Sequence, residues 1–275
     1  MSQPQPSSAA ETYERYFVPA MFVPWATILL RHASLRPGDR VLDVACGTGI
    51  VARLAAPLVS SNGHVVALDL NQAMLAVARA QPAPSGATIT WQEGNAMALP
   101  APDRSFDAVL CQHGLQFIPD RARAVSEMRR VLVPGGRALV IVLQALAGHP
   151  LFEALITSVA RHLSLPISAV MTPFALCDAD ELRGLFISAG FEKVDVVPES
   201  TKVRFPEPER FVPLVATSAA AAVPAFAELH APARESLLEA VSAEVEPTVR
   251  RFRDADSVAF PMFAHVARAT VGAML

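Results

Sequence analysis

The stretch VLDVACGTGIVARLA, residues 41–55, joins a β-type run to a helical run through a Cys-Gly-Thr-Gly turn. Apolar residues dominate the run before the turn, apart from Asp43, and recur at helical spacing after it. Gly47 and Gly49 lack a Cβ, so a ligand can approach the backbone closely there. The same glycines also suit a tight turn that binds nothing. The stretch therefore predicts an α/β fold and leaves the ligand open.

The alternation of β-type and helical runs continues well beyond this turn. Five β-type runs cover residues 40–45, 64–70, 87–92, 106–112 and 137–143, and helical spacing covers 50–59, 71–80 and 120–132. The β-type runs are nearly continuously apolar, as expected when helices cover both faces of a parallel sheet. We therefore predict a doubly wound α/β sheet built from right-handed βαβ units.

The remaining segments frame this core. Residues 178–190 predict a helix with Asp178 at its N-cap and Gly190 just past its end. Pro19 and Pro24 should break or bend any helix over 11–33. We expect an N-terminal helical cap at 1–35, a core at 36–197 with a lid insertion at 144–177, a helical lid insertion at 198–257, and a final strand in 258–275 that returns to the sheet.

Composition narrows the class of protein. Apolar residues make up 52% of the 275, which is enough for a buried core, and the net charge of −3 gives no footprint for nucleic acid. Three isolated cysteines argue against a disulfide framework or a zinc site, and no apolar run is long enough to span a bilayer. We expect a soluble cytoplasmic protein without a signal peptide, with a small-molecule partner, no nucleic acid and no membrane insertion. Homodimerisation is left open.

Three polar residues restrict the ligand. Asp69 ends the second predicted strand about 20 residues after the glycines, where a carboxylate can accept both ribose hydroxyls. Asp43 would repel a pyrophosphate but suits a ligand that carries positive charge, such as an amino group beside a sulfonium. Asn95, after the third predicted strand, is placed to grip an adenine edge.

Four motifs in order carry a family resemblance: VLDVACGTG at 41–49, VVALDL at 65–70, GNAMALPAPDRSFDAVLCQHGLQF at 94–117 and MRRVLVPGGRALV at 128–140. Together they resemble the class I S-adenosylmethionine-dependent methyltransferases, and within them the ubiquinone/menaquinone-type C-methyltransferases and their small-molecule relatives. The resemblance implies a seven-stranded Rossmann-like sheet whose last strand is antiparallel and lies next to the sixth. It also implies S-adenosylmethionine as cofactor. The histidines show no metal-ligand clustering, so we expect no metal.

The resemblance assigns roles to individual residues. It implies that Asp43 and the backbone of residues 45–49 hold the methionine part of the cofactor and that Asp69 holds the ribose. The residues after Asp69 contact the adenine, except Gln112, which lies near the methionyl group. The implied cofactor-binding set is Asp43, Val44, Ala45, Cys46, Gly47, Thr48, Gly49, Asp69, Leu70, Met74, Asn95, Ala96, Met97 and Gln112. The family usually has aspartate at the position of Asn95, but an amide can still accept and donate there.

Methyl transfer needs alignment and, where the acceptor loses a proton, a base. His113 is the first candidate for a catalytic base and His149 the second, although either histidine could simply pack. We expect Tyr16, Trp25, His113 and Phe117 to line the substrate pocket.

The predicted function is transfer of a methyl group by in-line displacement to a small apolar or aromatic acceptor, with C- or O-methylation favoured. One alternative is an NAD(P)-dependent oxidoreductase, which shares the glycine turn and Asp69. Another is a relative with this fold that binds or rearranges a small molecule without methylating it.

Overall fold

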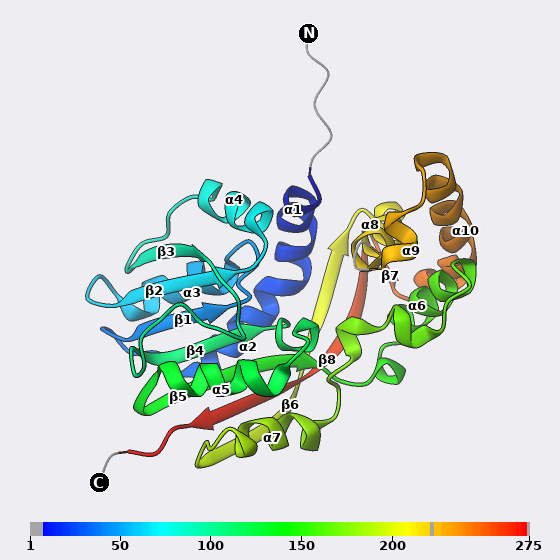
Figure 1. The fold of residues 1–275 in the computed structure, drawn as a ribbon. Coiled ribbons are helices and arrows are strands. Elements are labelled where there is room, and N and C mark those ends of the chain that lie inside the picture. The colour runs from blue at the N-terminus through cyan, green and yellow to red at the C-terminus, as the bar shows by residue number, and fades with distance from the viewer. Residues whose placement is uncertain (1–7, 221–222, 274–275) are drawn as a thin grey trace.

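A computed structural model describes residues 8–220 and 223–273 (Figure 1). Residues 1–7, at the start of the predicted N-terminal cap, lie outside the described residues. The described chain forms one mixed sheet with strand order β3-β2-β1-β4-β5-β8-β6, and β7 pairs with β8 off this path. The strands are β1 Arg40–Val44, β2 His64–Asp69, β3 Thr88–Glu93, β4 Phe106–Gln112, β5 Leu132–Leu143, β6 Lys193–Pro206, β7 Arg253–Asp254 and β8 Ser257–Thr270.

The pairing of these strands confirms the predicted architecture. Strands β1 to β5 are parallel, and β8 lies antiparallel between β5 and β6. The predicted number of strands was wrong, because the described residues form eight rather than seven. The extra strand is the two-residue β7, which pairs with the start of β8.

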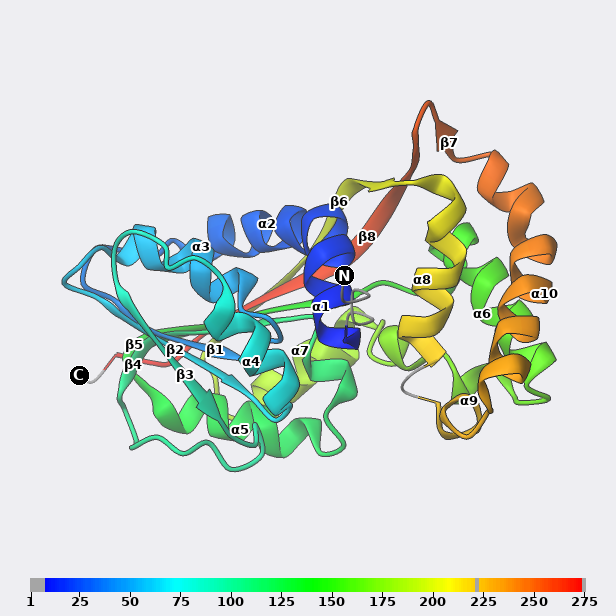
Figure 2. The ribbon, with the colours of Figure 1, turned by 90° about the horizontal axis from the view of Figure 1, so that it is seen from above.

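Helices cover both faces of the sheet, so the doubly wound prediction is also confirmed. Figure 2 shows α2 (Val23–Ala33) and α3 (Ile50–Val59) on one face and α5 (Arg121–Val131) and α7 (Ala179–Ser188) on the other. Helix α4 (Gln72–Ala80) packs beside β3. Successive side chains of a strand point to opposite faces of the sheet and so contribute to both cores. Val41 belongs to the core under α2 and α3, and the next residue, Leu42, belongs to the core under α5 and α7.

The N-terminal segment stays helical through its prolines. Helix α1 (Ala9–Thr12) continues into a π-helical segment, η1 (Tyr13–Phe22), and then into α2. Pro19 lies inside the π-helical segment, and Pro24 lies in the first turn of α2, where a proline disturbs the hydrogen bonds of an α-helix least. The axis turns between η1 and α2 (Figure 2), so the prolines bend the helix but do not break it.

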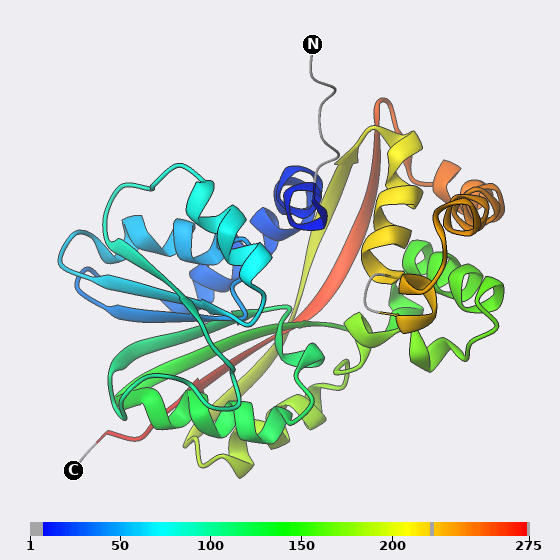
Figure 3. The ribbon, with the colours of Figure 1, turned by 45° about the horizontal axis from the view of Figure 1, so that its top comes forward.

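Strand β6 is longer than predicted. The predicted boundary at residue 198 lies within β6, which continues to Pro206 and pairs with β8 along its whole length. Strand β5 pairs with only the second half of β8, from Ala264 to Thr270. The remaining half of the β6–β8 pair therefore projects beyond the core as a two-stranded ribbon (Figure 3). Its alternating pattern buries Val203 and Phe205.

A helical lobe lies at the far end of this ribbon (Figures 2 and 3). It contains α6 (Pro150–His162), the short η4 (Ile167–Ala169), α8 (Pro208–Ala220), α9 (Pro224–Ala227) and α10 (Ala231–Arg250), whereas η5 (Thr172–Phe174) packs on β5. The hydroxyl of Ser158 on α6 donates to Glu244 Oε2 on α10 at 2.7 Å. Two short 3-10 helices, η2 (Leu115–Phe117) and η3 (Leu146–Gly148), complete the described elements. No helix within the described ranges has both the length and the apolar character that a bilayer span requires.

Candidate functional site

The glycine turn between β1 and α3 requires its glycines. Ala45, Gly47 and Gly49 all have positive φ, at +56°, +57° and +84°. A Cβ on Gly49 would lie 2.3 Å from ring carbons of Trp91, far inside contact distance. The turn is therefore both conformationally restricted and closely packed on its β3 side.

Asp69 holds the turn from the neighbouring strand. Its Oδ2 accepts the N–H of Gly47 at 2.7 Å and its Oδ1 accepts the N–H of Asn71 at 2.8 Å. Carboxylate oxygens can each accept a further hydrogen bond, so the predicted ribose contact is compatible with this arrangement. Leu70, the next residue, is 69% exposed and offers an apolar surface beside the carboxylate.

Asp43 lies beneath the turn rather than on its rim. The side chain is buried, and its Oδ2 accepts the N–H of Ala52 in the first turn of α3 at 3.0 Å. Burial raises the pKa of this carboxyl to about 8, and the charge of Asp69 adds to the effect. A cationic group near the turn would favour the ionised form, in keeping with the sequence argument.

The remaining predicted cofactor residues lie along the same edge of the sheet. Asn95 is exposed and its Oδ1 accepts the N–H of Met97 at 2.9 Å. Gln112 ends β4, its Nε2 donates to the carbonyl of Phe22 at 3.0 Å, and its Oε1 is buried with no partner. The others lie as follows: Val44, Cys46, Thr48 and Ala96 are buried, whereas Met74 is half-buried.

These residues fit S-adenosylmethionine. The buried oxygens Thr48 Oγ1 and Gln112 Oε1 have no partner in the described chain, and an unsatisfied buried polar atom costs about 1–3 kcal/mol. A ligand at the glycine turn can remove the cost at Gln112. The glycine backbone, the Asp69 carboxylate and the exposed Leu70 supply surfaces for an amino acid, a ribose and a flat base.

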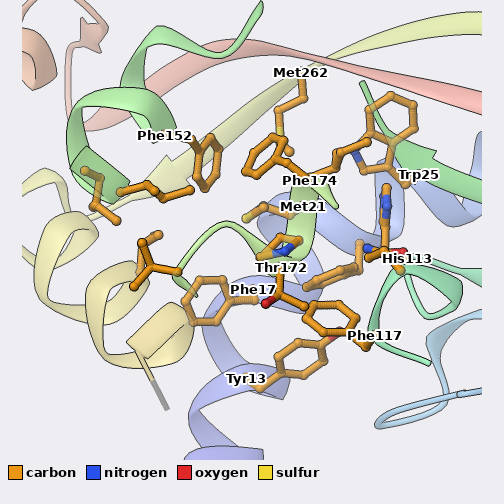
Figure 4. Close-up of a pocket in the computed structure, with 18 of the residues that line it drawn as sticks. Tyr13, Phe17, Met21, Trp25, His113, Phe117, Phe152, Thr172, Phe174 and Met262 are labelled. Carbon is orange, nitrogen blue, oxygen red and sulfur yellow. The ribbon is translucent and has the colours of Figure 1, made fainter. Parts of the chain in front are cut away.

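A cavity of about 210 Å³ lies beside the turn (Figure 4). Its walls come from the N-terminal helices, the loop after β4, η5 and the helical lobe, and they are mostly aromatic and aliphatic. Trp25, His113 and Phe117 line it, as the sequence analysis expects of a substrate pocket. Phe117 is 48% exposed.

Tyr13 lies between the cavity and the glycine turn, and it is not among the residues predicted to line the substrate pocket. The ring lines the cavity, and its hydroxyl lies 3.9 Å from the point where a Cβ of Gly47 would be. Burial, and then the nearby Asp69, raises the pKa of the Tyr13 hydroxyl, which therefore stays neutral. The density of aromatic residues in 13–25 was the available signal, but helical phase decides which of them face the site.

Tyr16 does not line the cavity. Its side chain is buried, its hydroxyl accepts a hydrogen bond from Arg210 of α8, and the guanidinium lies 4.4 Å from the ring centroid. Three residues after Tyr13 on a π-helical segment, it points toward the lobe instead. Tyr16 thus fastens η1 to α8.

His113 has an unusual position at the end of β4. Its φ is +50°, and neither ring nitrogen has a partner. The ring packs edge-to-face on Trp25, with centroids 5.7 Å apart. Burial lowers the pKa of His113 to about 3, so the ring is neutral at physiological pH and is a weak base.

His149 does not belong to this cavity. Its Nδ1 pairs with the carbonyl of Ala145 at 3.0 Å, and its Nε2 accepts the N–H of Phe263 at 3.0 Å. Because backbone groups occupy both nitrogens, the ring fixes η3 against β8. The structure gives no support to the predicted role of His149 as a base.

The positions of the cysteines and of possible metal ligands indicate neither a nucleophile nor a metal site in the described residues. Burial raises the pKa of the Cys46 thiol and raises that of Cys111 to about 12, so both are protonated, packed thiols. Over the described ranges, no group of three or more His, Cys, Asp or Glu side chains has the arrangement of a metal site.

Comparison with known proteins connects this site to a family. Residues 41–136 match the model of a methyltransferase domain. The chain is 42% identical over 119 residues to the 2-phytyl-1,4-naphthoquinone methyltransferase of Synechococcus elongatus, covering 42% of this chain and 51% of that relative. It is 34% identical over 188 residues to the ubiquinone/menaquinone biosynthesis C-methyltransferase UbiE of Shewanella sediminis, covering 62% and 73%.

A solved structure shares the fold. Phosphoethanolamine N-methyltransferase 2 of Haemonchus contortus, solved with phosphomonomethylethanolamine and S-adenosylhomocysteine, aligns with a TM-score of 0.53 at 19% identity, over 99% of this chain and 62% of that chain. A likeness at this identity shows the fold alone.

The glycine turn, the sheet order and the sequence matches define a class I Rossmann-like methyltransferase. The chain belongs to the class I S-adenosylmethionine-dependent methyltransferase family and is related to its quinone C-methyltransferases. It spans about half the length of the Synechococcus relative. None of these matches supports the oxidoreductase alternative.

Proposed function

We propose that the protein transfers a methyl group from S-adenosylmethionine to a small apolar acceptor held in the cavity, with C- or O-methylation favoured. One observation carries the proposal: the ring of Tyr13 lines the apolar cavity and its edge lies 3.9 Å from the point that a Cβ of Gly47 would occupy in the glycine turn. Two ligands, one at each place, would therefore meet at Tyr13. Family membership supports S-adenosylmethionine as the ligand at the glycine turn.

We propose that the residues along the carboxyl edge of the sheet bind the cofactor. When bound, S-adenosylmethionine supplies an electrophilic methyl group on a sulfonium. Asp69 would accept hydrogen bonds from the ribose, Leu70 and Met74 would pack on the adenine, and Asn95 with Ala96 and Met97 would contact its edge. The glycine turn and Gln112 hold the methionine part, and Asp43 acts through the turn, since it is buried beneath it.

For the acceptor, the chain supplies alignment and exclusion of water. The cavity walls are largely aromatic and aliphatic, so an apolar ring is the chemistry that they hold best. Holding the two reacting groups in line can lower a barrier by roughly 7–11 kcal/mol. The naphthoquinone in the name of the Synechococcus relative agrees with an apolar ring as acceptor.

We also propose that the segments around the cavity act as its cover. The N-terminal cap, residues 144–177 and the helices within 198–257 supply most of the cavity lining, whereas the sheet supplies the glycine turn. A small-molecule partner, rather than nucleic acid, agrees with the net charge of −3. The cytoplasmic location stays a prediction that rests on the isolated cysteines.

The test is a methyl-donor assay against phenols, quinones, indoles, amines and thiols, with S-adenosylhomocysteine as the readout. Calorimetry with S-adenosylmethionine and with NAD(P)H accompanies it. We expect S-adenosylmethionine to bind and at least one apolar aromatic acceptor to yield S-adenosylhomocysteine. Binding without any turnover across the panel would favour the non-methylating alternative, and binding of NAD(P)H alone would reject the proposal.

A further inference from the structure

Three residues that line the cavity carry polar side-chain atoms that no other described residue satisfies. These residues carry four buried side-chain atoms without a hydrogen-bond partner: Trp25 Nε1, Nδ1 and Nε2 of His113, and Gln116 Oε1. The described residues contain nine such atoms in total, so nearly half of them belong to residues that line this one cavity. We call Trp25, His113 and Gln116 the polar cluster.

Burial and backbone geometry fix the positions of the polar cluster. Trp25 is fully buried in α2, and Gln116 is only 3% exposed on η2. The positive φ of His113 and the hydrogen bond from its N–H to the carbonyl of Ile141, at 2.9 Å, turn its ring toward Trp25 (Figure 4). Gly114 permits this turn, because a Cβ there would lie 2.7 Å from the Cβ of Ala45.

Such a cluster is costly without a ligand. Each buried donor or acceptor without a partner lowers the stability of the protein by about 1–3 kcal/mol. The surrounding walls are mostly aromatic and aliphatic carbon, which cannot pair with these atoms. A ligand group that pairs with the cluster recovers this cost, so the cluster should decide which apolar molecules bind.

The chemistry of the cluster identifies that group. The indole of Trp25 only donates, Gln116 Oε1 only accepts, and the neutral ring of His113 does one at each nitrogen. Among the described residues, none that lines the cavity is Asp, Glu, Lys or Arg, so an ionised ligand group would find no counter-charge there. An uncharged hydroxyl, which donates and accepts at one oxygen, matches the cluster.

We propose that Trp25, His113 and Gln116 form a specificity-determining subsite that binds an uncharged hydroxyl group on the acceptor. The proposal rests on the proposed function in taking the ligand of this cavity to be the methyl acceptor. Its test measures binding in the absence of cofactor, so it can fail or succeed independently of methyl transfer.

The test compares ligands of equal shape. The full-length protein is titrated by calorimetry with 2-naphthol, with 2-methylnaphthalene and with 2-naphthoate. A purely apolar cavity would favour 2-methylnaphthalene, because the hydroxyl must be desolvated. We expect instead that 2-naphthol binds about tenfold or more tightly than 2-methylnaphthalene, and that 2-naphthoate binds weakest.

Variants assign the preference to the cluster. Trp25→Phe keeps most of the ring but removes the N–H, and Gln116→Leu removes the acceptor; each should reduce the preference for 2-naphthol by about fivefold or more. Phe152→Leu, in the apolar wall, is the matched control and should weaken both neutral probes equally. Gln116→Leu keeps the test decisive if Trp25→Phe does not fold.

Several results would overturn the proposal: equal binding or absence of binding of the two neutral probes, or a preference that Gln116→Leu leaves unchanged. Failure to form S-adenosylhomocysteine would count against the proposed function and not against the subsite.

Discussion

At the scale of single residues, burial changes the chemistry that the sequence seemed to offer. His113 was expected to act as a base or to contact substrate, but burial lowers its pKa to about 3. A general base works best with a pKa near the working pH, so the neutral ring serves better as a hydrogen-bonding group. The same physics raises the pKa of Asp43 to about 8.

His113→Ala should lower kcat/KM for the acceptor by about 10- to 100-fold, because the loss of a buried hydrogen bond costs about 1–3 kcal/mol. The dissociation constant for S-adenosylmethionine should stay within about twofold of wild type. Steady-state kinetics and calorimetry measure both. His64→Gln, at the opposite end of the sheet, is the matched control. Wild-type kinetics in His113→Ala would remove the residue from the site.

Asp43→Asn should raise stability most at high pH. Between about pH 4 and pH 8 the folded protein keeps a proton on Asp43 that the unfolded chain has released, so this carboxyl lowers stability as pH rises through that window. We expect the melting temperature of Asp43→Asn to exceed that of wild type by about 4 °C or more at pH 8, and by much less at pH 4. A difference that does not change with pH would contradict the burial argument.

At the scale of elements, turns carry the site and regular strands and helices support it. The β1–α3 turn is held by the hydrogen bond from the Gly47 N–H to Asp69, and the turn after β3 by the one from the Met97 N–H to Asn95. Both turns lie at the carboxyl edge of the parallel strands, where this class of fold binds ligands. Small changes in these turns should therefore affect binding more than stability.

Gly49→Ala tests the packing of the first turn. The substitution adds a strained φ and a Cβ 2.3 Å from Trp91, so we expect cofactor affinity to fall by more than about tenfold. Gly38→Ala is the matched control: its φ is +91°, but a Cβ there meets nothing within 4 Å. Gly38→Ala should lower the melting temperature without changing affinity. Equal affinity losses in the two variants would show that general destabilisation is responsible.

Asn95 tests the second turn. An aspartate at this position can still accept the N–H of Met97, whereas alanine cannot. We therefore expect Asn95→Ala to weaken S-adenosylmethionine binding by about tenfold and Asn95→Asp by about threefold or less. Calorimetry on the three proteins decides, and equal affinities for all of them would exclude a role for residue 95.

At the scale of the whole molecule, the N-terminal helix connects the sheet to the helical lobe. Glu14 on η1 pairs with Arg53 on α3 at 2.7 Å, and both side chains are mostly buried. Arg53 also donates to the carbonyl of Thr48 in the glycine turn at 2.5 Å. On the other side, Tyr16 accepts from Arg210 of the lobe. The helix therefore holds cavity and glycine turn in one arrangement.

Arg53→Gln should loosen that arrangement. Breaking a buried pair leaves Glu14 without its partner, so we expect faster proteolysis within 8–35 and a loss of about tenfold in cofactor affinity. Limited proteolysis measures the first effect, and calorimetric titration with S-adenosylmethionine measures the second. Arg31→Gln, which breaks a more exposed pair with Glu199, is the control and should change little. An unchanged cleavage rate in Arg53→Gln would show that the pair does not fasten the helix.

Much of this protein could be predicted from local patterns. The strand of residues 106–112 and the helix of residues 50–59 lie where hydrophobic spacing predicted them, and Asp178 is the N-cap of α7 as predicted. The antiparallel last strand followed from family resemblance. Local signals failed at β6, because its outer half is stabilised by pairing with β8, some sixty residues away.

The sequence by itself determined the sheet core, the glycine turn and the family, since these depend on periodicity and on residues close together in the chain. Only the tertiary structure decided which aromatic and polar side chains face the cavity. Tyr13 lines it and Tyr16 does not, His113 has no partner for its ring and His149 has two, and Gln116 gains importance solely by being buried. Burial and long-range contact set these roles, and neither is encoded in local spacing.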